Sequence, residues 1–163
     1  MSAPVQAYVA LGANLGEPVR QIETALSELA ALPESRLTAR SSFWRSRPEG
    51  FASQPEFVNA VAALETRLPA RALLAALLEI ERRHGRERIF RNAPRTLDLD
   101  ILLYAELVLD EPGLHLPHPR LHLRPFVLLP LAEVAGERLA VPGHGALAEL
   151  IRRLPPHDAC RLD

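Results

Sequence analysis

Two stretches of the chain place apolar side chains at the spacing of one helix face. In the first, from Pro18 to Leu32, the stripe is made by Ile22, Leu26 and Leu29. In the second, from Pro69 to His84, the stripe comprises Leu73, Leu74, Leu77, Leu78 and Ile80. A proline suits the first turn of a helix, and Gly85 is a typical helix stop. Both stretches are therefore predicted to be helices.

Other stretches have the alternation or the β-branched and aromatic content of strands. The predicted strands are Ala7–Leu11, Leu37–Arg45, Phe57–Glu65 and Leu97–Leu103, with Leu107–Leu109 as a short hairpin partner of the last one. Two segments without periodicity, Ser46–Pro55 and Arg86–Arg95, are predicted to be loops of functional length. Short helical segments at Phe126–Val134 and Gly145–Arg153 would close the domain.

The order strand, helix, strand, strand, helix, strand predicts an α+β sandwich. Its sheet would be mainly antiparallel, with the helices packed on one face and the active site on the other face. The chain has 163 residues, of which 48% are hydrophobic and 24% charged, so it suits one domain over residues 1–163.

Charge and cysteine content narrow the classes of function. The net charge is −1 and the isoelectric point is near 6.6, which argues against nucleic-acid or anionic-membrane partners. The single Cys160 fits a reducing compartment. No stretch approaches the roughly 20 apolar residues of a membrane span. We expect a cytoplasmic protein.

The stretch Leu97–Leu103 contains two acidic residues that would share one face of a strand. Leu97, Leu99 and Ile101 would point to one side, and Asp98 and Asp100 to the other. The two aspartates would lie roughly 7 Å apart along the strand, close enough to bind one metal ion or a pair. Carboxylates select Mg²⁺, which takes further ligands from substrate phosphates. The alternative is an amphipathic edge strand with a solvated acidic face.

A group of arginines precedes this acidic strand. Arg86, Arg88, Arg91 and Arg95 supply guanidinium groups, which can bind phosphate oxygens in a bidentate manner. Carboxylates for metal and arginines for phosphate together predict a phosphoryl-transfer site.

Other candidate side chains have both structural and functional interpretations. Phe57 and Asn59 would share a strand face and could stack on and hydrogen-bond a flat heterocycle, or could be core residues. A zinc site at His115, His118 and His122 is disfavoured because prolines break any helical register between them and no cysteine is near.

Several motifs resemble the 6-hydroxymethyl-7,8-dihydropterin pyrophosphokinase family of folate biosynthesis. They run from Tyr8–Gly16, through Ser41–Arg45 and Gln54–Ala60, to Pro94–Ile101 and Leu116–Arg120. The resemblance implies a ferredoxin-like βαββαβ fold. It also implies transfer of pyrophosphate from ATP to the hydroxymethyl oxygen of the pterin, with release of AMP.

The same resemblance implies roles for individual residues. Asp98 and Asp100 would bind two Mg²⁺ ions, and Arg86 and Arg95 would act with them in catalysis. Pterin binding would involve Ser46, Arg47, Glu49, Phe57, Asn59 and Phe126. ATP binding would involve Glu81, Arg88, His118 and Arg124. The partners would be these two small molecules, and the protein would act as a monomer.

Two places in the sequence depart from the pattern of the resembling family. Arg91–Ala93 stands where some relatives carry tryptophan, and Pro119 follows His118 where an aromatic residue is often found. Packing over the substrates and contacts to the nucleotide could therefore differ. A metal-dependent nuclease or polymerase and a non-catalytic ligand sensor are the competing interpretations.

Overall fold

The computed structural model describes residues 3–46, 56–85 and 97–162. Its main sheet is antiparallel throughout and has the strand order β10-β3-β4-β1-β5, with β2 also pairing with β4. The strands are β1 (Val5–Ala13), β2 (Ser35–Arg40), β3 (Trp44–Ser46), β4 (Phe57–Thr66), β5 (Asp98–Tyr104) and β10 (Cys160–Arg161). The N-terminal strand β1 therefore lies inside the sheet, between β4 and β5.

Helices and two small hairpins complete the described structure. The helices are α1 (Pro18–Ala30), α2 (Ala70–Arg83), the 3-10 turn η1 (Leu121–Leu123), α3 (Pro125–Ala135) and α4 (Leu147–Arg152). The hairpins pair β6 (Leu109–Glu111) with β7 (Leu114–Leu116) and β8 (Ala140–Val141) with β9 (Gly145–Ala146). Among residues 3–46, 56–85 and 97–162, no helix has both the length and the apolar content needed to cross a membrane.

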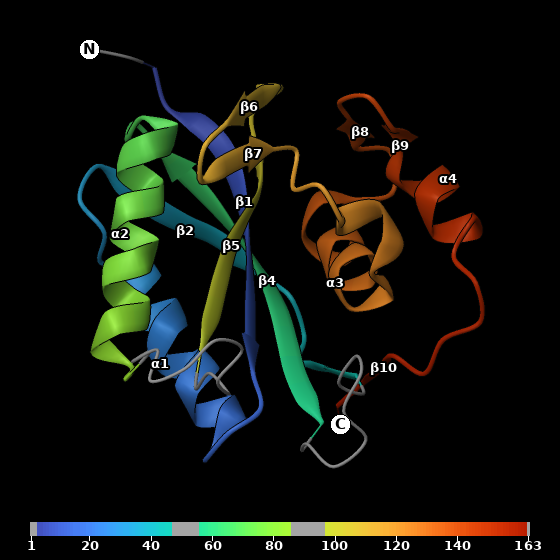
Figure 1. The fold of residues 1–163 in the computed structure, drawn as a ribbon, viewed down its shortest axis with the longest axis horizontal. Helices are drawn as coiled ribbons and strands as arrows, with labels where there is room; N and C mark the ends of the chain where they lie inside the picture. The colour runs from blue at the N-terminus through green and yellow to red at the C-terminus, as the bar shows by residue number, and fades with distance from the viewer. Residues whose placement is uncertain (1–2, 47–55, 86–96, 163) are drawn as a thin grey trace.

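One face of the sheet is covered by α1 and α2 (Figure 1). The alternating residues of the strands, such as Leu11 and Leu99, bury their side chains here against Leu29 and Leu77 of the two helices. Each fully buried leucine contributes about 1.5–3 kcal/mol of hydrophobic free energy. This packing gives α1, α2 and the central strands one continuous core.

The opposite face is not free of helices, which corrects the expectation from the sequence. A second core packs α3 against this face, and α4 packs on α3; Val61 and Leu102 of the sheet belong to this core together with Leu128 of α3 and Leu147 of α4 (Figure 1). Helix α3 is apolar on almost every side, so its sequence lacks the polar face that marks a surface helix. The site must therefore share this face with α3.

Two predicted elements differ from the observed ones. The segment Leu37–Arg45, predicted as one strand, is split into β2 and β3 at Ser41. The Ser41 N–H donates to the Val61 oxygen of β4, and the Ser41 hydroxyl, in place of its backbone oxygen, accepts from the Val61 N–H, both at 2.9 Å. The prediction that Leu107–Leu109 pairs with β5 was wrong, since Leu109 begins β6 and pairs with β7.

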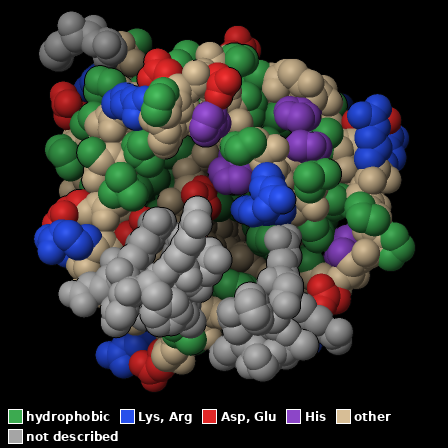
Figure 2. Space-filling view, viewed as in Figure 1, with side chains coloured by type: hydrophobic (Ala, Val, Ile, Leu, Met, Phe, Trp, Pro, Cys, Tyr) green, Lys and Arg blue, Asp and Glu red, His purple; other side chains and the backbone are tan. Residues whose placement is uncertain are grey.

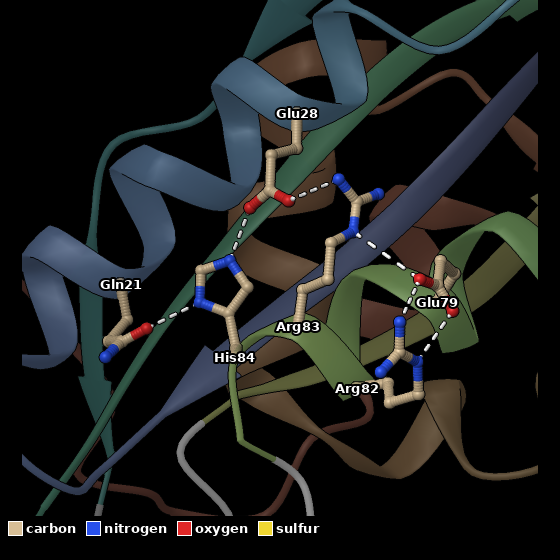
Figure 3. A network of polar contacts seen from close by, with 6 residues as sticks. All are labelled: Gln21, Glu28, Glu79, Arg82, Arg83 and His84. Atoms are coloured by element: carbon tan, nitrogen blue, oxygen red, sulfur yellow. Dashed lines mark hydrogen bonds and ion pairs between the residues drawn. The ribbon is translucent and has the colours of Figure 1, made fainter.

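A polar cluster joins α1 to the end of α2 (Figure 3). His84, the C-cap of α2, has a side chain only 8% exposed; its Nε2 donates to the Glu28 carboxylate and its Nδ1 lies 2.6 Å from Gln21 Oε1. Arg83 approaches the same carboxylate at 3.5 Å. The cluster thus holds His84, two positions before Arg86, in place at the end of α2.

We expect Glu28→Ala to lower the free energy of unfolding by about 1–3 kcal/mol, because it leaves the enclosed His84 ring without its acceptor. Urea denaturation at neutral pH measures the effect. Glu23→Ala, on an exposed position of the same helix, is the matched control and should change little. Equal losses in the two variants would contradict this role for the cluster.

Candidate functional site

The candidate residues meet in two neighbouring rows across the sheet. In the first row Gly12 of β1 lies between Asn59 of β4 and Asp98 of β5, and in the second row Ala10 is paired with Asp100. Directly paired residues of an antiparallel sheet point to the same side. This side is the face that carries α3, so the site occupies the part of that face next to the first row.

The acidic strand is confirmed as an alternating strand. Leu97, Leu99 and Ile101 are at most 5% exposed, whereas Asp98 is half-buried and Asp100 is exposed. Within the described ranges no three His, Cys, Asp or Glu side chains form a metal cluster. Two carboxylates suit Mg²⁺ when substrate phosphates and waters supply the other ligands. The donor set therefore fits this ion.

Glu81 forms a hydrogen bond with the outer edge of the acidic strand β5. In the described part of the chain β5 pairs only with β1, so its other edge needs a different acceptor. Glu81 of α2 is 1% exposed and accepts the N–H of Leu99 at 2.8 Å. Its carboxylate thus bonds to the backbone between Asp98 and Asp100. The family resemblance placed Glu81 at the ATP site, and its contact with the backbone of β5 was not predicted.

His118 is attached to the same strand. Its backbone N–H donates to the Leu102 oxygen at 2.9 Å, and its ring Nδ1 accepts the N–H of Arg120 at 3.1 Å. Burial lowers the pKa of His118, Asp100 raises it, and Arg124 and Arg120 lower it further. The neutral ring with Nδ1 accepting carries its proton on Nε2, which is left to donate to an anionic group.

Because the folded state resists protonation of His118, we expect the stability of the protein to decrease in acid. The stabilisation is fully present above about pH 6.5, the pKa of an unfolded histidine, and is lost as the pH falls through the lowered folded pKa. Urea denaturation between neutral and mildly acidic pH should show a shallower loss for His118→Gln than for the wild type. His157→Gln, at an exposed position, is the control and should follow the wild type.

Asn59 is held in one orientation although it lies at the site. Asn59 is only 7% exposed, and its side-chain Nδ2 donates a hydrogen bond to the hydroxyl of Ser46 at 2.9 Å. Ser46 belongs to β3 and is paired with Phe57, the first residue of β4. The structure thus brings together Ser46, Phe57 and Asn59, three of the residues assigned to the pterin.

Phe126 and Arg124 lie at the start of α3. The Arg124 guanidinium is 5.8 Å from the centre of the Phe126 ring, within the range of a cation–π contact. Figure 2, which views the sheet from its edge, shows histidine, basic and acidic side chains near the middle of the surface that it draws. A residue assigned to the pterin and a residue assigned to ATP are therefore neighbours.

Five assigned residues lie outside the described residues: Arg47, Glu49, Arg86, Arg88 and Arg95. Their roles stay predictions from the sequence. The loops predicted at Ser46–Pro55 and Arg86–Arg95 also fall almost entirely outside the described ranges.

Comparison with known proteins identifies the family of the chain. Residues 8–136 match the family described as 7,8-dihydro-6-hydroxymethylpterin-pyrophosphokinase (HPPK). The chain belongs to the HPPK family. A relative from Pseudomonas aeruginosa, named 2-amino-4-hydroxy-6-hydroxymethyldihydropteridine pyrophosphokinase, is 51% identical over 91% of this chain and 91% of its own. A relative of the same name from Haemophilus influenzae is 42% identical over 98% of this chain and 99% of its own.

Solved structures show the same fold. A crystal structure described as HPPK-DHPS in complex with substrates superposes with a TM-score of 0.73 at 12% sequence identity. The match covers 93% of this chain and 43% of that chain. The HPPK fold is thus found in a chain more than twice as long.

Proposed function

We propose that this HPPK family member transfers the pyrophosphoryl group of ATP to the hydroxymethyl oxygen of 6-hydroxymethyl-7,8-dihydropterin, giving the pterin diphosphate and AMP in folate biosynthesis. Family membership supports the pyrophosphokinase activity and the use of ATP. The observation that carries the assignment to particular residues is the row in which Asn59, Gly12 and Asp98 lie side by side.

Asp98 and Asp100 would hold the metal ions, proposed as two Mg²⁺. When bound, such ions neutralise charge on the phosphate oxygens and favour the alkoxide form of an alcohol. The two aspartates sit on a strand fixed by β1 on one side and by Glu81 on the other. They are therefore held in a defined position before any substrate binds.

ATP would be bound on the β5 and η1 side of the site. His118 offers an Nε2 proton beside Asp100, and Arg124 and Arg120 add positive charge near it. Arg88 is assigned to the nucleotide by resemblance, and Arg86 and Arg95 to the transition state. Guanidinium groups at the transferred phosphates stabilise charge without covalent catalysis.

The pterin would be bound on the β4 and β3 side. Asn59 can accept from and donate to the amide-like edge of the ring, while Phe57 and Phe126 would enclose its faces. Ser46 positions the Asn59 amide through its hydroxyl. Arg47 and Glu49 belong to the same proposed pocket by resemblance.

The proposal includes the wider organisation of the protein. The strand order β5-β1-β4-β2, with α1 and α2 on one face, supports a ferredoxin-like βαββαβ core. Residues 1–163 would form one domain that acts as a cytoplasmic monomer on two small molecules.

The test is a coupled assay of the purified protein with ATP, Mg²⁺ and the pterin alcohol. We expect AMP and the pterin diphosphate in equal amounts, and no AMP when the pterin is omitted. Formation of ADP, or AMP release that does not depend on the pterin, would contradict the proposed reaction.

A further inference from the structure

Gly12 differs from the other described glycines. Gly16, Gly85, Gly113, Gly136, Gly143 and Gly145 have positive φ angles, which explains why those positions are glycine. Gly12 has no such angle and lies inside β1, with strands on both sides. A strand interior disfavours glycine because there is no side chain to pack. The backbone therefore gives no reason for glycine at this position.

The space beside Gly12 gives that reason. An ideal Cβ on Gly12 would lie 3.2 Å from Asn59 Oδ1 and 3.9 Å from the Val58 oxygen. The first distance is tighter than an ordinary van der Waals contact, so the amide would have to move by a few tenths of an ångström. The nearest neighbour is thus a side chain that the proposed function assigns to substrate recognition.

The Asn59 amide has little freedom to move away. Its Nδ2 donates to Ser46 on β3, on the opposite side from Gly12, and the residue is 7% exposed. The amide is therefore hydrogen-bonded to Ser46 on β3, and its Oδ1 occupies space beside Gly12 on β1 that a side chain at position 12 would need. A shift of its Oδ1 would have to tilt or break the bond to Ser46.

We propose that Gly12 is a positioning residue for substrate recognition: by lacking a side chain, it allows the Asn59 amide to take the orientation that reads the polar edge of the heterocyclic substrate. This inference rests on the proposed function, in which Asn59 binds the pterin. Gly12 acts through Asn59 and needs no contact of its own with the reacting atoms. The atoms that a Cβ on Gly12 would approach both belong to β4, whereas ATP would be bound on the β5 and η1 side, so binding of the pyrophosphate donor should change little.

The test is a double-mutant cycle of Gly12→Ala and Asn59→Ala, with KM measured separately for the pterin and for ATP. We expect Gly12→Ala to raise the pterin KM about tenfold or more, in the range that one added carbon costs in a fitted pocket, with the ATP KM little changed. In the Asn59→Ala background the same substitution should leave the pterin KM unchanged, because the atom it displaces is gone.

The control is Ala39→Val, which adds carbon atoms to β2 of the same sheet away from Asn59, and should alter neither KM. Thermal unfolding of all variants shows whether they fold. If Gly12→Ala alone is unfolded, the double variant decides: we expect it to melt no lower than Asn59→Ala and to share its pterin KM.

A pterin KM that rises equally in both backgrounds would overturn the inference, since Gly12 would then not act through Asn59. An unchanged pterin KM in folded Gly12→Ala would also overturn it. A wild-type protein that forms no pterin diphosphate contradicts the proposed function instead, so the two failures are distinguishable.

Discussion

Asp98→Ala and Asp100→Ala are each expected to lower kcat/KM by about 10³-fold, the upper range for losing one group that stabilises transition-state charge. Both carboxylates lie on the face of β5 that points to the site, and each would bind metal ions that the phosphates of ATP share. The folded state should be as stable as the wild type or more stable, because one of two like charges is removed.

Turnover at saturating Mg²⁺ and thermal unfolding measure the two parts of this prediction. Asp110→Ala is the matched control, since Asp110 is an exposed aspartate of β6 that pairs with His115. The control should keep wild-type turnover. Near-normal activity of either Asp98→Ala or Asp100→Ala would show that the metal ligands are assigned wrongly.

The second large effect is expected at Glu81. Glu81→Ala should lower the free energy of unfolding by about 3 kcal/mol, because the buried N–H of Leu99 loses a charged acceptor. It should also lower kcat, since Asp98 and Asp100 flank the released peptide group. Glu81→Gln keeps an acceptor oxygen and should therefore lower the free energy of unfolding and kcat less than Glu81→Ala does.

Glu79→Ala is the matched control, two residues away on the same helix. Glu79 is on the surface and bonds to Arg82, which also lowers its pKa. Exposed pairs of this kind contribute little to stability. Urea denaturation and initial rates should therefore separate the two variants clearly; a Glu81→Ala protein as stable and active as Glu79→Ala would contradict the supporting role.

Much of the sheet could be predicted because its signals are local. The alternation around Asp98 and Asp100 placed the leucines and the aspartates on opposite faces, as the structure confirms. The stripes of α1 and α2 were visible because each helix has one polar side. These patterns depend only on neighbours in sequence.

The missed features depend on distant partners. The predicted helical segment Phe126–Val134 is confirmed as α3, but its packing on the site face was missed, because a helix without a polar side carries no signal of which surface it covers. The break between β2 and β3 after Arg40 depends on the hydrogen bonds between Ser41 and Val61. The role of Glu81 depends on Leu99 of β5, which is 18 residues away in the sequence and donates its N–H to the Glu81 carboxylate. The predicted strand Ala7–Leu11 ended before Gly12, whereas β1 continues to Ala13. A glycine opposite an asparagine gives no signal until the register is known.

The central position of β1 has a consequence for how the protein forms during synthesis. This strand is synthesised well before one of its two neighbours, β5, which begins at Asp98. Until then the backbone N–H and C=O groups on the edge of β1 that β5 will cover are open to pairing with other chains, a recognised route to aggregation. Contacts this distant in sequence also fold slowly. Asp98 and Asp100 can therefore join the row of Asn59 and Gly12 only after β1 and β4 have been made, so a chain interrupted before β5 would contain Asn59 but neither of the proposed metal ligands.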